Sequence, residues 1–90
     1  MQEILKVVWQ GEPCQVIMKN GEVLKKSCIV LQRPGGEHEE SFVATMFGNL
    51  AGCRFRPGEL VLAVLHFTHH EYNESMFQDV IARDIINLTN

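Results

Sequence analysis

The chain has 90 residues, of which 46% are hydrophobic and 21% charged, a composition typical of a soluble globular protein. This length allows one hydrophobic core, so we expect a single domain over residues 1–90. No apolar run approaches the roughly 20 residues of a membrane span, and the first residues lack the features of a secretory signal. The sequence therefore predicts a cytoplasmic protein that does not act in a membrane.

The charge of the chain is unevenly distributed. Residues 1–35 carry five basic and three acidic side chains, whereas residues 36–90 carry three basic and eight acidic ones. Every lysine lies within the first 26 residues, although the formal net charge of the chain is −3. A local basic surface is thus compatible with an acidic total.

Turn signals separate the apolar runs into five predicted strands. The runs cover residues 4–9, 14–18, 23–31, 41–47, 60–67 and 77–88. The first two form one strand with a bend at Gly11-Glu12-Pro13, and the next pairs back across Asn20-Gly21, a strong hairpin signal. The last run also fits a helical spacing, but its β-branched residues and the lack of a turn signal favour a long strand.

The strand pattern is interrupted once, between residues 48 and 57. Asn49 is expected to cap a short helical turn over residues 50–51, and Gly52 is expected to end it. Three strands, a helical turn and two further strands are the order of an OB-fold. We therefore predict an all-β, five-stranded Greek-key barrel with a short helical turn between strands 3 and 4. Closing the sheet onto itself buries its apolar side without a covering helix.

Two segments carry a resemblance to bacterial single-stranded DNA-binding proteins. Phe47-Gly48-Asn49-Leu50-Ala51 resembles the phenylalanine-glycine-x-leucine-alanine block of that family. Arg56-Pro57-Gly58-Glu59-Leu60-Val61 is similar to its basic-x-glycine-x-x-valine strand start. The likeness covers residues 41–88 well and residues 1–40 only in strand order. The short chain, without an acidic C-terminal tail, looks closer to the compact, PriB-like branch of the superfamily.

The resemblance implies non-specific, weak binding of single-stranded DNA, or of RNA, in a role accessory to replication, repair or plasmid transfer. In this family bases stack on aromatic rings while basic side chains follow the phosphates. Phe47 falls on a family stacking position and Tyr72 falls near another. The candidate nucleic-acid-binding residues are Trp9, Lys25, Lys26, Arg33, Phe47, Arg54, Arg56 and Tyr72. Each has a plainer alternative, a structural role for the rings and a solvated surface role for the basic side chains.

Two departures from the family lower the expected affinity. Ser41 stands at one stacking position, although Phe42 is adjacent. The loop that carries another aromatic in the family contains Arg33-Pro34 and the acidic segment Glu37-His38-Glu39-Glu40 here. Each lost stack removes about 1–3 kcal/mol, and acidic side chains repel phosphate. An OB-fold module for protein–protein contact, without nucleic-acid binding, is therefore the alternative function.

The sequence gives little support for catalysis or for a cofactor. The three cysteines are widely spaced, which indicates reduced thiols rather than a zinc or redox motif. His66, His69 and His70 would point to both faces of a strand, so a solvated strand end is favoured over a metal site. No partnered nucleophile and no glycine-rich phosphate loop is present. We predict a protein that is not an enzyme and holds no metal.

The first strand predicts self-association. Between Ile4 and Trp9 only Lys6 interrupts the apolar residues, and an OB barrel leaves this strand partly unpaired. An unpaired apolar edge favours pairing with another chain. The resembling families form symmetric oligomers, so we expect a homodimer or homotetramer built on two-fold pairing of first strands.

Overall fold

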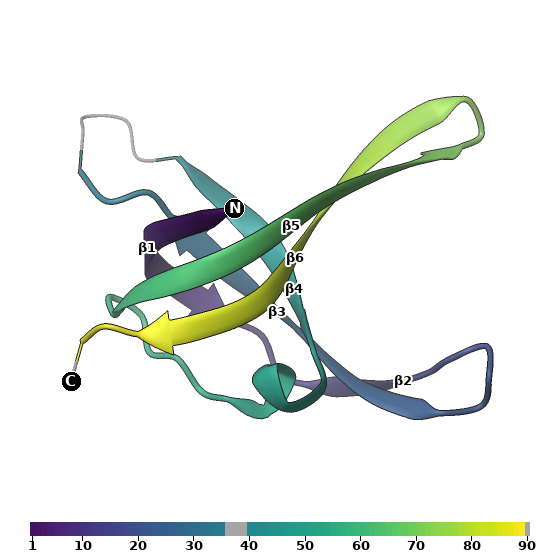
Figure 1. The fold of residues 1–90 in the computed structure, drawn as a ribbon, viewed down its shortest axis with the longest axis horizontal. Coiled ribbons are helices and arrows are strands. Elements are labelled where there is room, and N and C mark those ends of the chain that lie inside the picture. The colour runs from purple at the N-terminus through teal and green to yellow at the C-terminus, as the bar shows by residue number, and fades with distance from the viewer. Residues whose placement is uncertain (36–39, 90) are drawn as a thin grey trace.

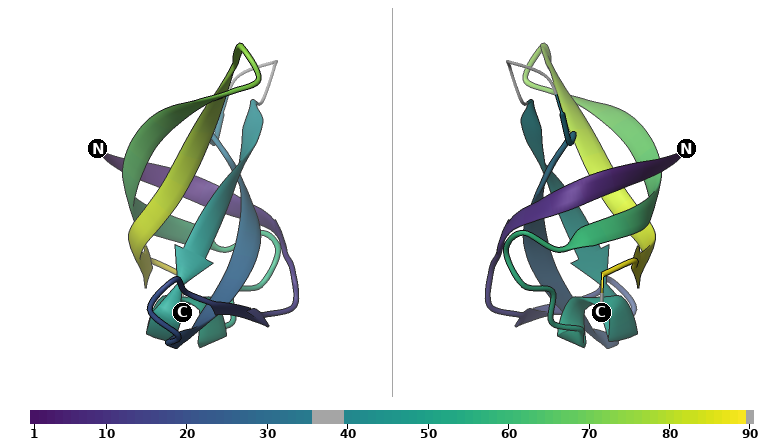
Figure 2. Two further views of the ribbon diagram at one scale, coloured as in Figure 1. Left: turned by 90° about the vertical axis from the view of Figure 1, so that its right-hand side faces the viewer. Right: turned by 90° about the vertical axis from the view of Figure 1, so that its left-hand side faces the viewer.

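The computed structural model describes residues 1–35 and 40–89, apart from the side chains of His70, Tyr72 and Phe77. The elements are β1 (Gln2–Gln10), β2 (Cys14–Ile17), β3 (Val23–Gln32), β4 (Ser41–Phe47), the 3-10 helix η1 (Gly48–Gly52), β5 (Leu60–Tyr72) and β6 (Ser75–Asn87). The strand order is β1-β5-β6-β4-β3-β2, and an additional pairing of β1 with β3 closes the sheet. Figure 1 and the two turned views in Figure 2 show the strands wrapping around a common axis.

The predicted OB-fold is confirmed. β1 and β2 both pair antiparallel with β3, on either side of the bend at residues 11–13, so together they form one interrupted strand of a five-stranded barrel. β4 and β6 meet in parallel through Thr45 and Ile81. The 3-10 helix η1 follows the third of these five strands, as the interruption of the sequence pattern predicted.

The core follows from the alternation of residues along each strand. Because successive side chains point to opposite faces, one face of the closed sheet supplies the barrel interior. Ala51 of η1 is 1% exposed and adds a small apolar group. The Oγ of Ser27 donates a hydrogen bond to the Ala51 carbonyl oxygen at 3.1 Å, which joins η1 to β3. The buried hydrophobic residues are Leu5, Val7, Ile29, Leu31, Ala44, Met46, Ala51, Val61, Ala63, Leu65, Ala82 and Ile85.

The strand boundaries differ from the prediction mainly in the last hairpin. β5 continues beyond residue 67 to Tyr72, and β6 begins at Ser75, so the two strands are longer than expected. Asn73 (φ 51°) and Glu74 (φ 65°) form the two-residue turn, and positive φ at both positions is the geometry of a type I′ hairpin. The polar residues after Phe67 hid this part of the strand, because an extended ribbon outside the barrel has no buried face to mark it. The last run is a strand and not a helix.

The predicted cap at Asn49 is wrong. The helix η1 begins at Gly48, its N-cap residue is Phe47, and no side chain forms a capping hydrogen bond. Gly48 adopts φ 67°, a conformation that glycine reaches at low cost, so the chain turns one residue earlier than expected. The helix ends at Gly52, as predicted.

Among the described residues, no helix is long and apolar enough to cross a membrane.

Candidate nucleic-acid interface

A β-bulge decides where the only tryptophan of the chain points. Val7 pairs with Leu31 and Trp9 pairs with Val30, so Val8 is an extra residue on β1. Simple alternation would turn Trp9 inward with Leu5 and Val7, which are buried. The bulge shifts the register by one residue, and Trp9 is 56% exposed. Trp9 therefore lies on the outer side of the barrel, on the same face as Val30.

The same outer side carries Phe47 and Lys26. Lys26 of β3 pairs directly with Phe47 of β4 on one side and with Cys14 of β2 on the other. Directly opposed residues of antiparallel strands share a face of the sheet, so these three side chains form one row. Val30 pairs with Val43, which is 56% exposed, and extends the row of Trp9 toward β4. We call this surface the Trp9–Phe47 face, and it consists of Trp9, Cys14, Lys26, Cys28, Val30, Val43, Thr45 and Phe47.

A pocket of about 470 Å³ opens on this face beside Trp9. It lies between the bend that joins β1 to β2 and the facing segment of β3. Gly11 lines the pocket next to the indole, since a Cβ at Gly11 would lie 3.1 Å from Cη2 of Trp9. Lys26 and Glu12 bring opposite charges to an otherwise mostly apolar lining. The lining residues are Trp9, Gly11, Glu12, Cys14, Val16, Lys26, Ser27 and Cys28.

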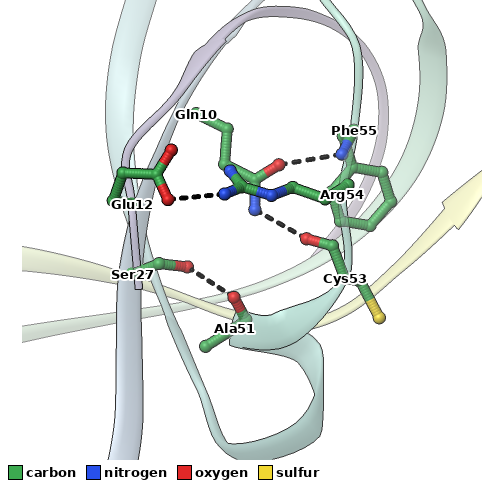
Figure 3. Close-up of polar contacts among 7 residues, drawn as sticks. All are labelled: Gln10, Glu12, Ser27, Ala51, Cys53, Arg54 and Phe55. Carbon is green, nitrogen blue, oxygen red and sulfur yellow. Dashed lines mark hydrogen bonds and ion pairs between the residues drawn. The ribbon is translucent and has the colours of Figure 1, made fainter. Parts of the chain in front are cut away.

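Side-chain hydrogen bonds hold the bend beside the pocket in place. The carboxamide of Gln10 donates from Nε2 to the Cys53 carbonyl oxygen at 2.7 Å and accepts the Phe55 N–H at Oε1 over 2.8 Å. Arg54 Nη2 reaches Glu12 Oε2 at 2.6 Å. Figure 3 shows these contacts, which link β1 and the bend to the segment that follows η1, together with the hydrogen bond from Ser27 of β3 to Ala51 within η1. The pocket wall is therefore braced by polar contacts.

The basic candidates do not all gather at the Trp9–Phe47 face. Lys25 points to the opposite side of β3 from Lys26, where its Nζ lies 3.2 Å from the position that a Cβ on Gly52 would take. Arg54 forms an exposed ion pair with Glu12, which lines the pocket. Among the described residues, no acidic side chain forms an ion pair with Lys25 or Lys26.

Two arginines lie away from this face. Arg33 follows β3 at its other end, where its Nε is 2.8 Å from Glu3 Oε1. The backbone N–H of Arg56 donates to the carboxylate of Glu59, which also accepts a hydrogen bond from the Asn87 side chain. These hydrogen bonds and the nearby Arg56 charge lower the pKa of Glu59. Arg33 is thus part of an ion pair. The backbone of Arg56 helps to hold Glu59, just before β5, against Asn87 at the end of β6.

Tyr72 is the last residue of β5 and pairs with Ser75 across the turn. Its backbone lies at the tip of the long β5–β6 hairpin, at the upper right of Figure 1. Its side chain lies outside the part of the chain that the structure describes, and its predicted stacking role stays a prediction. Phe42 cannot replace the aromatic missing at Ser41, because it packs against the core while Ser41 is exposed. The acidic loop segment at residues 37–39 lies outside the described residues.

The structure adds surface features that the sequence alone did not give. Val43, Cys14 and Cys28 join the Trp9–Phe47 face through strand register, which no local sequence signal specifies. Within the described residues, no group of three or more histidine, cysteine or acidic side chains could hold a metal ion. The side chain of His70 lies outside the described part of the structure.

No protein-family model matches the sequence, and no curated protein matches it. Among solved structures, the fold is similar to a Plasmodium falciparum SSB in complex with ssDNA. The TM-score is 0.50 and the identity 17%, over 99% of this chain and 93% of that chain. At this identity the similarity concerns the fold, and it agrees with the closed OB barrel seen here.

Proposed function

We propose that this protein binds single-stranded DNA without sequence specificity through the Trp9–Phe47 face. The observation that carries the proposal is the bulge at Val8, which brings Trp9 to the side of the barrel that also presents Phe47 and Lys26. A bulge has a cost in strand pairing, and re-aiming one side chain is a common reason for it. An exposed indole beside a lysine is the combination that single-strand binding requires.

In this proposal each residue has a separate role. The indole of Trp9 and the ring of Phe47 stack on bases, while Lys26, which pairs with Phe47 and lines the pocket beside Trp9, contacts the phosphate backbone. The pocket beside Trp9 gives an unstacked base an apolar wall. Lys25 and Arg54 serve as secondary phosphate contacts, because Lys25 points to the other side of β3 and Arg54 must share its charge with Glu12.

The similar fold of the Plasmodium falciparum SSB bound to ssDNA supports the proposal at the level of fold. The resemblance of residues 47–51 to bacterial single-stranded DNA-binding proteins adds a sequence argument that does not depend on it. From both we infer a cytoplasmic protein of the compact, PriB-like kind, accessory to replication, repair or plasmid transfer. Binding is weak, because Ser41 supplies no ring and the net charge is −3.

The test is a titration with oligo-dT, followed through the fluorescence of the single tryptophan. We expect the emission of Trp9 to be quenched on binding and the affinity to fall as salt rises from about 50 mM to 200 mM. A duplex of the same length should bind less well, because its bases are already paired and stacked and cannot stack on Trp9 and Phe47. Equal affinity for duplex and single strand, or no binding to either, would contradict the proposal.

A protein–protein module with the same fold is the second candidate, favoured by the acidic total and the exposed edge of β1. Residues 2–6 of β1 pair with β5 and residues 6–10 pair with β3, so among the described strands each half has a partner on one side only. Ile4 is 52% exposed on this strand. We propose that β1 pairs with its two-fold copy to form a homodimer, or a dimer of dimers. Light scattering over a micromolar range tests this, and a mass near 10.2 kDa throughout would contradict it.

A further inference from the structure

Two β-hairpins extend from the barrel as two-stranded ribbons. Among the described residues, the strand residues between Gln15 and Lys25 pair only with each other, because β3 first pairs with β4 at Lys26. In the same part of the structure, residues 67–80 also pair only with each other, since β5 pairs with β1 no further than Val64 and β6 meets β4 at Ile81. Figure 1 shows the two hairpins at the lower right and the upper right of the molecule. We call residues 14–26 the basic arm and residues 66–80 the acidic arm.

The two arms carry opposite charge. The basic arm has three lysines and one glutamate, which gives a formal charge of +2. The acidic arm has Glu71, Glu74 and Asp79 and neither lysine nor arginine, which gives −3 with neutral histidines. Lys19, Glu71 and Glu74 are all exposed. The charge asymmetry of the sequence is therefore concentrated, in three dimensions, on two projections.

Both arms also expose apolar side chains. On the basic arm Ile17 pairs with Val23, and these side chains are 78% and 58% exposed. On the acidic arm Met76 is 63% exposed and Phe67 is 41% exposed. A two-stranded ribbon without a packed face is only marginally stable in water, so both arms gain from covering these residues.

We propose that the basic arm of one copy docks on the acidic arm of a second copy. Opposite charge selects the partner surface and sets its orientation, and the exposed apolar residues supply the buried area. The two arms of one copy do not contact each other, because among the described elements β2 contacts only β3. The contact is separate from the β1 edge and does not depend on nucleic-acid binding.

The experiment is sedimentation velocity of the full chain without nucleic acid, with charge-reversed variants alone and mixed. Lys19→Glu with Lys25→Glu makes both arms acidic, and Glu71→Lys with Glu74→Lys makes both arms basic. We expect wild-type association to weaken roughly tenfold between about 50 mM and 500 mM salt, since exposed charges are screened. Each variant alone should associate no more strongly than the wild type does at high salt, because its two arms carry charge of the same sign and repel each other.

Mixing the two variants should restore association at low salt, because each then offers the arm that the other lacks. Glu22→Lys, which adds positive charge to the basic arm, should strengthen association of the otherwise wild-type chain. Circular dichroism of each variant checks that the barrel is folded. The proposal would be overturned if the sedimentation mass of the wild type did not change with salt. It would also be overturned if the mixture of the two variants sedimented no faster than each variant alone. A dimer of unchanged mass in both variants would assign self-association to β1 instead.

Discussion

The two arms are the same structural device with different side chains. Each is a two-stranded antiparallel ribbon that continues a pair of barrel strands outward, and each closes through a short turn. The basic arm begins where Lys26 meets Phe47, so it continues directly into the Trp9–Phe47 face. The acidic arm carries Tyr72 at its tip, but Glu71 and Glu74 lie on either side of that tip.

This difference shows how one barrel can separate a surface that attracts nucleic acid from a surface that attracts a basic protein. Phosphate is attracted to the basic arm and the adjoining face, and it is repelled from the acidic arm unless another basic surface covers it. We therefore expect nucleic acid to lie along β1, β3 and β4. The acidic arm is better suited to a basic protein surface. Both arms extend from the barrel because their backbones form two-stranded ribbons, and the charge of each arm determines which partner it attracts.

The largest effect is expected from reversing the charges nearest the proposed interface. Lys25→Glu with Lys26→Glu should weaken oligo-dT binding by roughly 10- to 100-fold and flatten its salt dependence by about 1.4 log units per decade, as for two lost phosphate contacts. Glu71→Lys with Glu74→Lys, the matched change on the acidic arm, should leave the affinity unchanged or raise it severalfold. Titrations at several salt concentrations measure both. Equal losses in the two variants would remove the distinction between the arms.

Phe47→Ala should affect both binding and stability. The ring pairs across the strands with Lys26 and is half-buried, so its loss removes a base stack of about 1–3 kcal/mol and part of the packing beneath it. We expect the free energy of unfolding to fall by about 1–3 kcal/mol as well. Val43→Ala on the same face is the control, because it removes exposed apolar area without removing a ring. Urea unfolding and oligo-dT titration separate the two effects, and a Phe47→Ala chain that binds normally would exclude stacking there.

Tyr72→Ala should give a smaller loss of binding with the fold intact. A ring at the hairpin tip can stack on a base only where the nucleic-acid strand passes Glu71 and Glu74, which repel phosphate. We therefore expect the loss of binding free energy to be less than the full value of about 1–3 kcal/mol for one stack. Met76→Ala, also on the acidic arm, controls for lost apolar surface. The measurement is affinity per folded molecule, with circular dichroism for the fold. If Tyr72→Ala unfolds the protein while that affinity is unchanged, the role assigned to Tyr72 is wrong.

Local sequence patterns predicted the barrel well, because its determinants are local. Alternating apolar residues, Asn20-Gly21 and the break at residues 48–57 each act over a few positions and agree with one another. The orientation of Trp9 could not be predicted in this way, since it depends on a bulge that is set by the pairing of β1 with β3. The fold also brings Arg33 to Glu3 and Arg54 to Glu12, and these ion pairs reduce the charge that each arginine can offer to a phosphate. Charged residues that are distant in sequence meet only once the chain is folded.

The smallest effect is expected from Gly11→Ala, which asks whether the position of the indole matters or only its presence. Gly11 does not adopt a positive φ, so alanine is acceptable for the backbone. Its Cβ would lie 3.1 Å from Cη2 and 3.4 Å from Cζ3 of Trp9, closer than ordinary contact, so the ring must move by a few tenths of an ångström. Because Trp9 is 56% exposed, it can move outward, and the free energy of unfolding should change by less than about 1 kcal/mol. Oligo-dT affinity should fall by only a few fold if base stacking needs the indole where β1 and the pocket hold it. Tryptophan fluorescence reports the position of the ring through the shift of the emission, and it reports binding through the quenching of that emission. An emission shift without any change in affinity would mean that the ring binds equally well away from the pocket, and Trp9→Ala would then measure all that the indole contributes.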